Sequence, residues 1–406
     1  MTQQNGLLNF SAKEGLLPRE EMLETKHEKT PITIGIPKEN KDIERRVPLV
    51  PDAVNLLVEN NHKVIIERGA GLQARFDDMA YADAGATLVS DKEQVYSADI
   101  ILKIAPPEPA EIDLLSKHKT IFSTISLQNS SREYFKALMD KRVNAVAYDF
   151  IQDKTERFPV VQSMSEIVGT TAVFVAAEYL SDPNFGKGML LGGFPGIKPA
   201  EVIIIGSGTV AEYAARTAIG MGASVKIFDN SIYKLRNIQI NLGTRLFTSV
   251  LQPQVLEKAL IDADVVISAK YSVTGDTACI IPEDTVKKMK EGSVIVDVSI
   301  DQGGCFETSY PTTHVKPVFV KHGVTHYCVP NMASRVPHTA SYSLSNILSS
   351  VLLDMGEAGG LERYLKLNFP FSKGVYIFNG KLTNRNIGEH FSLPSRDLEL
   401  ILAAFH

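Results

Sequence analysis

The sequence predicts an α/β protein of two domains, one of them built on a doubly wound parallel sheet. Strand-like runs rich in β-branched residues alternate with segments of helical apolar spacing in both halves of the chain. This alternation is typical of parallel sheets covered by helices. A glycine-rich turn at Gly206 joins one such strand to one such helix. The chain has 406 residues, which exceeds the ~150 that a single domain usually needs.

The first half of the chain begins with polar residues of mixed charge, which we interpret as an N-terminal extension over residues 1–31. A helix is expected over Pro51–Asn60, and a long helix over Glu166–Leu180 would carry the chain into the second domain. Buried strands are expected at Ile32–Ile36, Lys63–Glu67, Ala98–Ile104, Thr120–Ser126 and Ala145–Tyr148.

The second half repeats the alternation. Helices are expected over Thr209–Met221 and Thr339–Glu357, and the remaining C-terminal tail holds short, less periodic pieces. Strands are expected at Glu201–Ile205, Ser224–Phe228, Val265–Ala269, Ser293–Val298 and Thr325–Val329. We therefore predict a nucleotide-binding domain over 160–337, inserted into a first domain made of 32–159 and 338–406.

Composition excludes several classes of protein. Lys and Arg total 42 against 47 Asp and Glu, a net charge of −5, which argues against a nucleic-acid or basic membrane-surface partner. No apolar stretch approaching the ~18 residues that span a bilayer is recognised, and no secretory signal is visible at the N-terminus. Cys279, Cys305 and Cys328 are too dispersed for a disulfide framework or a zinc site. We expect a cytoplasmic protein that acts on a small molecule and binds no metal.

The turn Gly206-Ser207-Gly208-Thr209-Val210-Ala211 has the context of a Rossmann dinucleotide site, since a strand precedes it and a helix follows. Gly206 and Gly208 would let the backbone approach a pyrophosphate, and Ala211 still permits close helix–strand packing. Asp229 ends the next strand, 23 residues after Gly206, where an acid binds the adenosine ribose and repels a 2′-phosphate. The pattern favours NAD, with NADP kept open by the nearby cations Lys234 and Arg236.

A second match to the glycine pattern, Gly69-Ala70-Gly71-Leu72-Gln73-Ala74, also follows an expected strand. Charged residues follow it at once, from Arg75 to Asp78, where a buried helix would have to continue. We interpret this segment as a structural turn rather than a cofactor loop.

Asp301 lies in Ile300-Asp301-Gln302-Gly303-Gly304, directly after an expected strand of the nucleotide-binding domain. Ligands of doubly wound sheets bind outside the carboxyl ends of the strands, so Asp301 is expected at the cleft, near a nicotinamide ring. An aspartate that caps a glycine turn is the alternative interpretation.

The chain resembles the alanine dehydrogenases, and its N-terminal pattern also occurs in the related α subunit of nicotinamide nucleotide transhydrogenase. The resemblance runs from about Ile32 to about Leu382. It rests on Ile34-Gly35-Ile36-Pro37-Lys38-Glu39, Arg46-Val47-Pro48-Leu49-Val50-Pro51, Ile300-Asp301-Gln302-Gly303-Gly304-Cys305, Pro311-Thr312-Thr313-His314, His326-Tyr327-Cys328 and Val336-Pro337. It implies two α/β domains around a cleft, NAD as cofactor and a homo-oligomer, commonly a hexamer.

The resemblance also implies roles for single residues. The substrate-carboxylate arginine falls on Arg46, the nicotinamide-side aspartate on Asp301, the serine before the interdomain helix on Ser165 and the ribose acid on Asp229. A guanidinium suits carboxylate recognition, because its planar fork binds both oxygens.

Two catalytic groups of the family are replaced in this sequence. The substrate-binding lysine falls on Ala105, and the catalytic histidine falls on Ser126. Lys103, two residues earlier on the same strand face, is the candidate to replace the lysine, with an ion pair to a surface acid as the alternative. Asp149 is a further candidate acid–base group, with capping as its alternative role.

The resemblance implies an NAD-dependent alanine dehydrogenase, which oxidises L-alanine to pyruvate and ammonium. Two alternatives stay open: a member of the same fold with a different amino or keto acid substrate, and a transhydrogenase α-like NAD(H)-binding protein without alanine activity.

Overall fold

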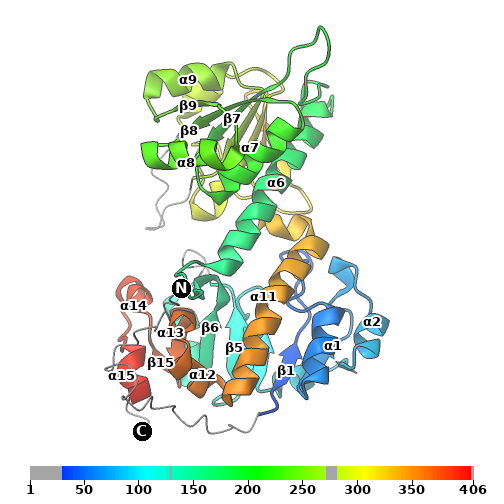
Figure 1. Ribbon diagram of the computed structural model, residues 1–406, viewed down its shortest axis with the longest axis vertical. Helices are drawn as coiled ribbons and strands as arrows, with labels where there is room; N and C mark the ends of the chain where they lie inside the picture. The colour runs from blue at the N-terminus through cyan, green and yellow to red at the C-terminus, as the bar shows by residue number, and fades with distance from the viewer. Residues whose placement is uncertain (1–29, 126, 128–129, 271–280, 404–406) are drawn as a thin grey trace, which may run out of the picture.

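The computed structural model describes residues 30–125, 127, 130–270 and 281–403. The described chain forms two lobes, each with its own sheet, joined by two long helices (Figure 1). This arrangement confirms the predicted α/β class and its two units.

The first lobe is built on an eight-stranded sheet whose central strands are parallel. Its strands, in spatial order, are β15 (Lys381–Leu382), β14 (Val375–Phe378), β6 (Asn144–Ala147), β5 (Thr120–Ser123), β4 (Ile100–Leu102), β1 (Thr33–Ile36), β2 (Lys63–Glu67) and β3 (Thr87–Val89). The strands β14 and β15 come from the C-terminal tail and pair antiparallel. The tail therefore belongs to the first lobe.

The helices of the first lobe are mostly short. They are α1 (Pro51–Glu59), η1 (Leu72–Ala74), α2 (Asp78–Asp83), α3 (Lys92–Tyr96), α4 (Pro109–Leu114), α5 (Arg132–Asp140), η2 (Tyr148–Phe150), α12 (Leu361–Leu367), α13 (Phe369–Ser372), α14 (Arg385–Phe391) and α15 (Leu398–Ala403). Local signals begin several of them. Pro51 occupies the first turn of α1, and Ser131 caps α5 by accepting the Tyr134 N–H at 3.2 Å.

The second lobe is built on a seven-stranded sheet. Its strands, in spatial order, are β12 (Val318–Lys321), β13 (Val324–Tyr327), β11 (Val294–Asp297), β10 (Val265–Ser268), β7 (Glu201–Ile205), β8 (Ser224–Phe228) and β9 (Phe247–Ser249). Its helices are α7 (Thr209–Gly220), α8 (Ile232–Leu242), α9 (Pro253–Ile261), α10 (Glu283–Val286), η3 (Val298–Gln302) and η4 (Met332–Arg335). All pairs are parallel except β12 with β13, as expected for a doubly wound sheet with one antiparallel edge.

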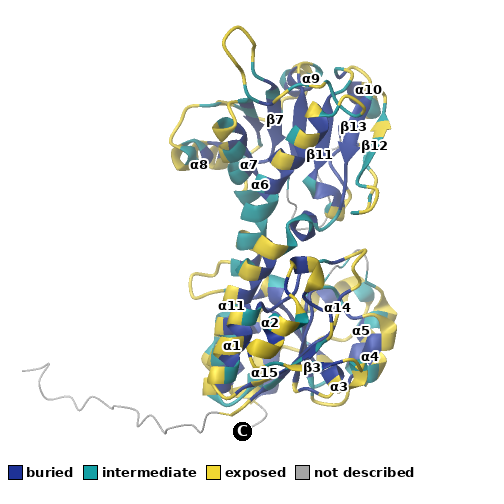
Figure 2. Ribbon diagram, turned by 90° about the vertical axis from the view of Figure 1, so that its right-hand side faces the viewer, coloured by how far each residue is buried: buried dark blue, intermediate teal, exposed yellow. Residues whose placement is uncertain are grey.

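The cores follow from the alternation of side chains along the strands. In the first sheet Leu102, Phe122 and Val146 lie side by side and pack on one face, whereas their neighbours Ile101 and Ile121 pack on the other. Both faces are therefore apolar, which explains why these strands read as continuous hydrophobic runs. Figure 2 shows strands of the second sheet, β7, β11 and β13, in the dark blue of buried residues.

Two long helices, α6 (Pro159–Ser181) and α11 (Pro337–Ala358), connect the lobes and pack against each other (Figure 1). Helix α6 is long and apolar enough to cross a membrane by length and composition, so the prediction that no stretch approaches that length overlooked it. Its side chains Ala172, Val175 and Ala176 are fully buried in the core of the second lobe. A core helix of this kind passes the same test of length and composition.

The predicted boundaries differ from the observed ones where the local signal is weak. Helix α6 begins at Pro159 rather than Glu166, since a proline is favourable in the first helical turn. Strands β4 and β5 end at Leu102 and Ser123, earlier than predicted. Strands β3, β9, β12, β14 and β15 were not predicted, because two to four residues are too short to show a period.

Candidate active site

The glycine turn at Gly206 connects β7 to α7 and has the backbone of a dinucleotide loop. Gly206 has φ +113°, and a Cβ there would meet the Ala269 carbonyl oxygen at 2.5 Å. Gly208 begins α7, and a Cβ built on it meets nothing within 4 Å. The Ser207 hydroxyl oxygen is buried without a hydrogen-bond partner in the described structure. Open space at a helix N-terminus with an unsatisfied hydroxyl beside it fits a phosphate group.

Close packing holds this turn in place. Ala211 is fully buried on the inner side of α7. Gly169 of α6 lies so near α7 that a Cβ there would be 2.3 Å from the Val210 carbonyl oxygen. The small residue expected at the third position of the motif therefore serves helix packing.

Asp229 lies half-buried at the carboxyl end of β8, next to β7 in the sheet. One of its carboxylate oxygens accepts the Ser231 N–H at 2.7 Å, and Ser231 in turn caps α8. This turn fixes the carboxylate at the position where an acid binds a ribose. Lys234 is exposed on the first turn of α8. The loop and the acid together fit NAD.

The second glycine match is a closed turn, as the sequence predicted. The Gly69 N–H donates to Asp78 Oδ1 at 2.7 Å, and the Ala74 and Phe76 N–H groups both donate to the Gly71 carbonyl at 3.0 Å. The helix that follows, η1, has only three residues. Backbone donors used inside the turn cannot bind a pyrophosphate.

Asp301 lies in η3, which leaves the carboxyl end of β11, and its side chain is exposed. Although Asp301 is exposed, the surrounding protein partly desolvates its carboxylate and thereby raises its pKa, with a smaller contribution from Asp297. Asp301 thus occupies the edge of the sheet at which ligands of doubly wound folds bind.

Asp297, which sequence reasoning missed, organises the turn that carries Asp301. It is completely buried and has four hydrogen-bond donors: Ser268 Oγ (2.6 Å), Ser309 Oγ (2.7 Å), the Cys305 N–H (2.9 Å) and the Ser299 N–H (3.2 Å). An aspartate at the last position of an apolar strand was the available signal.

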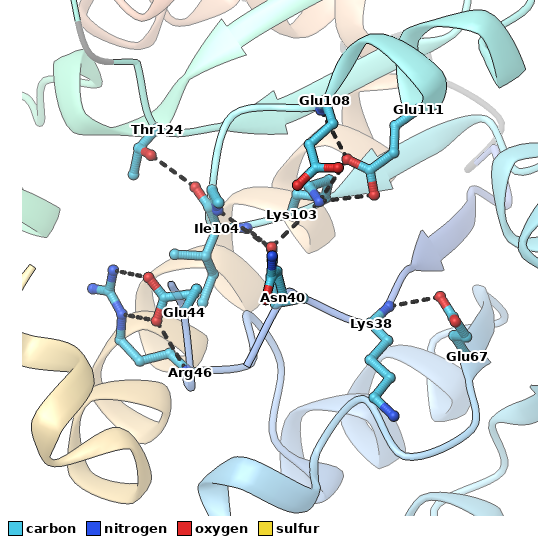
Figure 3. Close-up of polar contacts among 12 residues, drawn as sticks. Lys38, Asn40, Glu44, Arg46, Glu67, Lys103, Ile104, Glu108, Glu111 and Thr124 are labelled. Carbon is cyan, nitrogen blue, oxygen red and sulfur yellow. Dashed lines mark hydrogen bonds and ion pairs between the residues drawn. The ribbon is translucent and has the colours of Figure 1, made fainter. Parts of the chain in front are cut away.

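Arg46 is buried between the lobes. Its Nε and Nη2 donate to the two oxygens of Glu44, each at 2.8 Å (Figure 3). Nη2 also donates to Asn331 Oδ1 at 2.8 Å. Among the described residues, the hydrogen-bond partner of its Nη1 is the sulfur of Met164 on α6, at 3.3 Å. Burial opposes the charge of Arg46, but Glu44 outweighs it and raises the pKa of the guanidinium above its ordinary value. The fork is therefore fixed and charged, with Nη1 left for a ligand.

Lys103 does not stand free at the cleft. It is buried, and its ammonium lies 2.9 Å from Glu111 and 3.3 Å from Glu39. Figure 3 shows the ammonium of Lys103 beside Glu111. Burial lowers the pKa of Lys103, but the two carboxylates raise it by more, so the lysine stays charged. Glu39 also accepts the N–H groups of Ile104 and Ala105, at 2.6 and 3.3 Å. Lys103 therefore holds the backbone at Ala105 through Glu39.

Asp149 lies in η2, directly after β6, and is half-buried. Its carboxylate accepts a hydrogen bond from the Ile125 N–H and lies within the electrostatic field of Arg46. Burial raises the pKa of Asp149 to about 7, although Arg46 lowers it. An acid that titrates near neutral pH close to a buried arginine has the properties of an acid–base catalyst.

The other predicted residues fall around this group. Ser165 is half-buried on α6, one residue after the Met164 that contacts Arg46. Ala105 is half-buried after β4, and Ser126 lies outside the described residues. No group of three His, Cys, Asp or Glu side chains in the described ranges could hold a metal ion.

The fold and this site define a two-lobed, nucleotide-binding α/β protein with a preorganised arginine between its lobes. Residues 35–168 match the family model for the N-terminal domain of alanine dehydrogenase/PNT, and residues 172–385 match the model for its C-terminal domain. The chain therefore belongs to the alanine dehydrogenase/PNT family.

Individual relatives agree with this assignment. The chain is 36% identical over 367 residues to alanine dehydrogenase 2 of Staphylococcus aureus (strain USA300), which covers 90% of this chain and 98% of that protein. A solved L-alanine dehydrogenase is 37% identical, with a TM-score of 0.83 over 89% of this chain and 99% of that one. A transhydrogenase from Sinorhizobium meliloti has a TM-score of 0.74 at 22% identity, covering 87% of this chain and 99% of that one; this likeness concerns the fold alone.

Proposed function

We propose that this protein is an NAD-dependent alanine dehydrogenase, which oxidises L-alanine to pyruvate and ammonium and catalyses the reverse reaction. The observation that carries the proposal is the guanidinium of Arg46, fixed between the lobes by Glu44 and Asn331 with Asp149 in its field. Gly206, Gly208, Ala211, Asp229, Lys234 and Ser165 are the residues we propose to hold the cofactor. When bound, NAD would accept the hydride that leaves the substrate Cα.

The remaining chemistry falls to this chain's own side chains. Arg46 binds the substrate carboxylate through Nη1, because Glu44 already occupies its Nε edge. Asp149 has a pKa of about 7 and is ionised above that pH. It then accepts a proton from the substrate amine or from the attacking water. We place Asp301 on the nucleotide side of the cleft, where its carboxylate would stabilise the positive charge of an oxidised nicotinamide ring. Lys103 acts by positioning the Ala105 backbone through Glu39.

A second candidate follows from a specific observation. Lys103 is engaged by two buried carboxylates, which argues against Lys103 as the replacement for the lysine that the family resemblance expects at Ala105. This favours an NAD(H)-binding protein that has little alanine activity or that acts on another amino or keto acid.

One pair of measurements separates the two candidates. NADH formation is followed at 340 nm with L-alanine and then with a panel of amino acids, beside a fluorescence titration of NADH binding. Turnover of L-alanine above all other substrates supports the dehydrogenase. Tight NADH binding without alanine turnover rejects it and supports the second candidate. Absence of NADH binding rejects both.

We also propose a homo-oligomer, with a hexamer implied by the resemblance. The segment between α6 and β7 carries three exposed apolar side chains, Leu190, Phe194 and Ile197, of which Phe194 and Ile197 form a small hairpin bridge. Exposed apolar clusters of this kind mark protein interfaces. Light scattering of the purified protein tests this state. The cytoplasmic location and the domain boundaries at 159/160 and 337/338 stay predictions.

A further inference from the structure

A separate cavity lies where the turn after β2 meets the beginning of α11. Its volume is about 590 Å³, within the range of small-molecule sites. Its charged and titratable lining consists of Arg45, Arg75, Arg335 and His338, with no carboxylate among the residues that line it. None of the residues assigned above to substrate or cofactor lines it. We call this cavity the arginine pocket.

The positive charge of the arginine pocket is only partly compensated. Arg335 pairs with Glu178 of α6. Arg45 and Arg75 have no ion pair among the described residues. Two uncompensated guanidinium groups facing one cavity repel each other, in a chain whose net charge is −5. A protein that gathers such groups without acids creates a field that favours an anion.

The backbone that carries two of the pocket's arginines is constrained. The Arg45 N–H donates to Ser334 Oγ at 2.7 Å, which ties the Arg45 backbone to the residue before Arg335. Arg75 has φ +69°, a left-handed conformation that is unfavourable for a residue with a side chain. Uncommon backbone of this kind concentrates at ligand sites.

His338 adds a fourth polar group to the pocket. Its ring stacks on Phe76 with centroids 4.7 Å apart, and its Nδ1 lies 2.8 Å from the Ala74 carbonyl oxygen. A carbonyl only accepts, so Nδ1 carries a proton and donates, and this contact fixes the orientation of the imidazole ring. The turn at Gly69, whose backbone donors are used internally, supplies one wall of the pocket through Leu72, Gln73 and Arg75.

We propose that the arginine pocket binds a small, multiply charged oxyanion, a polyphosphate or a polycarboxylate. Guanidinium groups bind both classes through paired N–H donors, and two without an acidic partner, beside the paired Arg335, exceed what a single carboxylate needs. The proposal does not rest on the proposed dehydrogenase activity, because the lining residues include neither Arg46 nor the Gly206 turn.

The test is calorimetric titration of the full-length protein with inorganic pyrophosphate and, separately, with citrate. The protein is saturated with NADH beforehand, so that the Gly206 turn is not available to the probe. Arg75→Gln and Arg45→Gln should each raise the dissociation constant about tenfold or more, since each removes a charge-assisted contact. Arg216→Gln, which removes an exposed arginine on α7 far from the pocket, is the matched control and should leave it unchanged.

Each outcome decides the proposal. Binding of pyrophosphate alone identifies a polyphosphate ligand, and binding of citrate alone identifies a polycarboxylate. Failure of both probes to bind overturns the proposal, as does binding that Arg75→Gln and Arg216→Gln weaken equally. Thermal unfolding of each variant verifies that it is folded. If the protein does not bind NADH, the proposed function fails, and the same comparison of variants in its absence still tests the arginine pocket.

Discussion

Replacing Lys103 with methionine removes the cation that lies between two buried carboxylates and keeps most of the side-chain volume. Glu111 retains Lys92 at 2.8 Å as a partner, whereas Glu39 loses the one cation that is paired with it in the described part of the chain. Glu39 is 9% exposed, so solvent cannot take the place of the ammonium. Breaking a buried ion pair in this way costs about 3–5 kcal/mol of unfolding free energy.

The pH dependence of this cost has a definite sign. The pKa of Glu39 is already raised in the folded protein, chiefly by burial and against the influence of Lys103. Without Lys103 the pKa of Glu39 rises further. At low pH the protein therefore folds with Glu39 protonated, at little cost in unfolding free energy. Above the pKa of the unfolded chain, folding must desolvate or protonate this carboxylate, and the penalty grows as pH rises. We expect the loss of stability to be small near pH 4.5 and full at pH 8.

Urea unfolding of the wild type, Lys103→Met and Lys103→Met with Glu39→Gln measures the effect. Glutamine still accepts the Ile104 and Ala105 N–H groups through its amide oxygen, so the second substitution should restore about half of the loss or more. The reasoning is refuted if Lys103→Met costs less than about 1 kcal/mol at pH 8 or if Glu39→Gln worsens it. The activity per folded molecule of the wild type and of Lys103→Met is compared in parallel. If Lys103 donated to the substrate, its loss would lower this activity as well as the amount of folded protein.

Four further outcomes are expected at the site. Arg46→Lys keeps the charge but loses the fork, so KM for the amino acid should rise; an unaltered kcat/KM would remove Arg46 from the site. Asp229→Ala should weaken NAD binding and narrow its advantage over NADP, and unchanged affinities for both nucleotides would contradict the assignment. Asp149→Asn should lower kcat by ~10²–10⁴-fold and abolish the fall of wild-type oxidation below a pH of about 7; a retained acid limb would assign it to another group. Ala105→Lys and Ser126→His, made singly and together, should raise alanine oxidation from a low starting level. If the wild type oxidises alanine at an ordinary rate and replacement of Lys103 does not change that rate, the account of the missing donor is wrong.

Much of the nucleotide-binding lobe was predictable because its signals are local. A strand, a glycine turn and an apolar helix follow one another without interruption from Glu201 to Gly220, and Asp229 stands at the end of the next strand. Hydrogen bonds inside the turn at Gly69 also confirm that it is structural. The charges after that turn, which interrupt any buried helix, were a sufficient signal.

The partners of the site residues were not predictable, because they come from other elements of the fold. Glu39 reaches Lys103 from the loop after β1, Glu111 reaches it from α4, and Asn331 reaches Arg46 across 285 positions. A lysine two residues before a missing lysine looks from the sequence like a replacement for it. Only the fold reveals that two buried acids already hold its ammonium.

The contact between Arg46 and Asn331 joins one lobe to the other. Arg46 belongs to the loop after β1, and Asn331 precedes η4 at the end of the second lobe, where it also donates to Glu44. A carboxylate that binds Nη1 with one oxygen and reaches Nη2 with the other competes with the Asn331 side chain for the Nη2 hydrogens. Occupancy of the arginine and the angle between the lobes are therefore thermodynamically linked: a ligand that displaces Asn331 frees the second lobe to rotate, and any rotation that breaks the contact changes the affinity for carboxylates by the same factor.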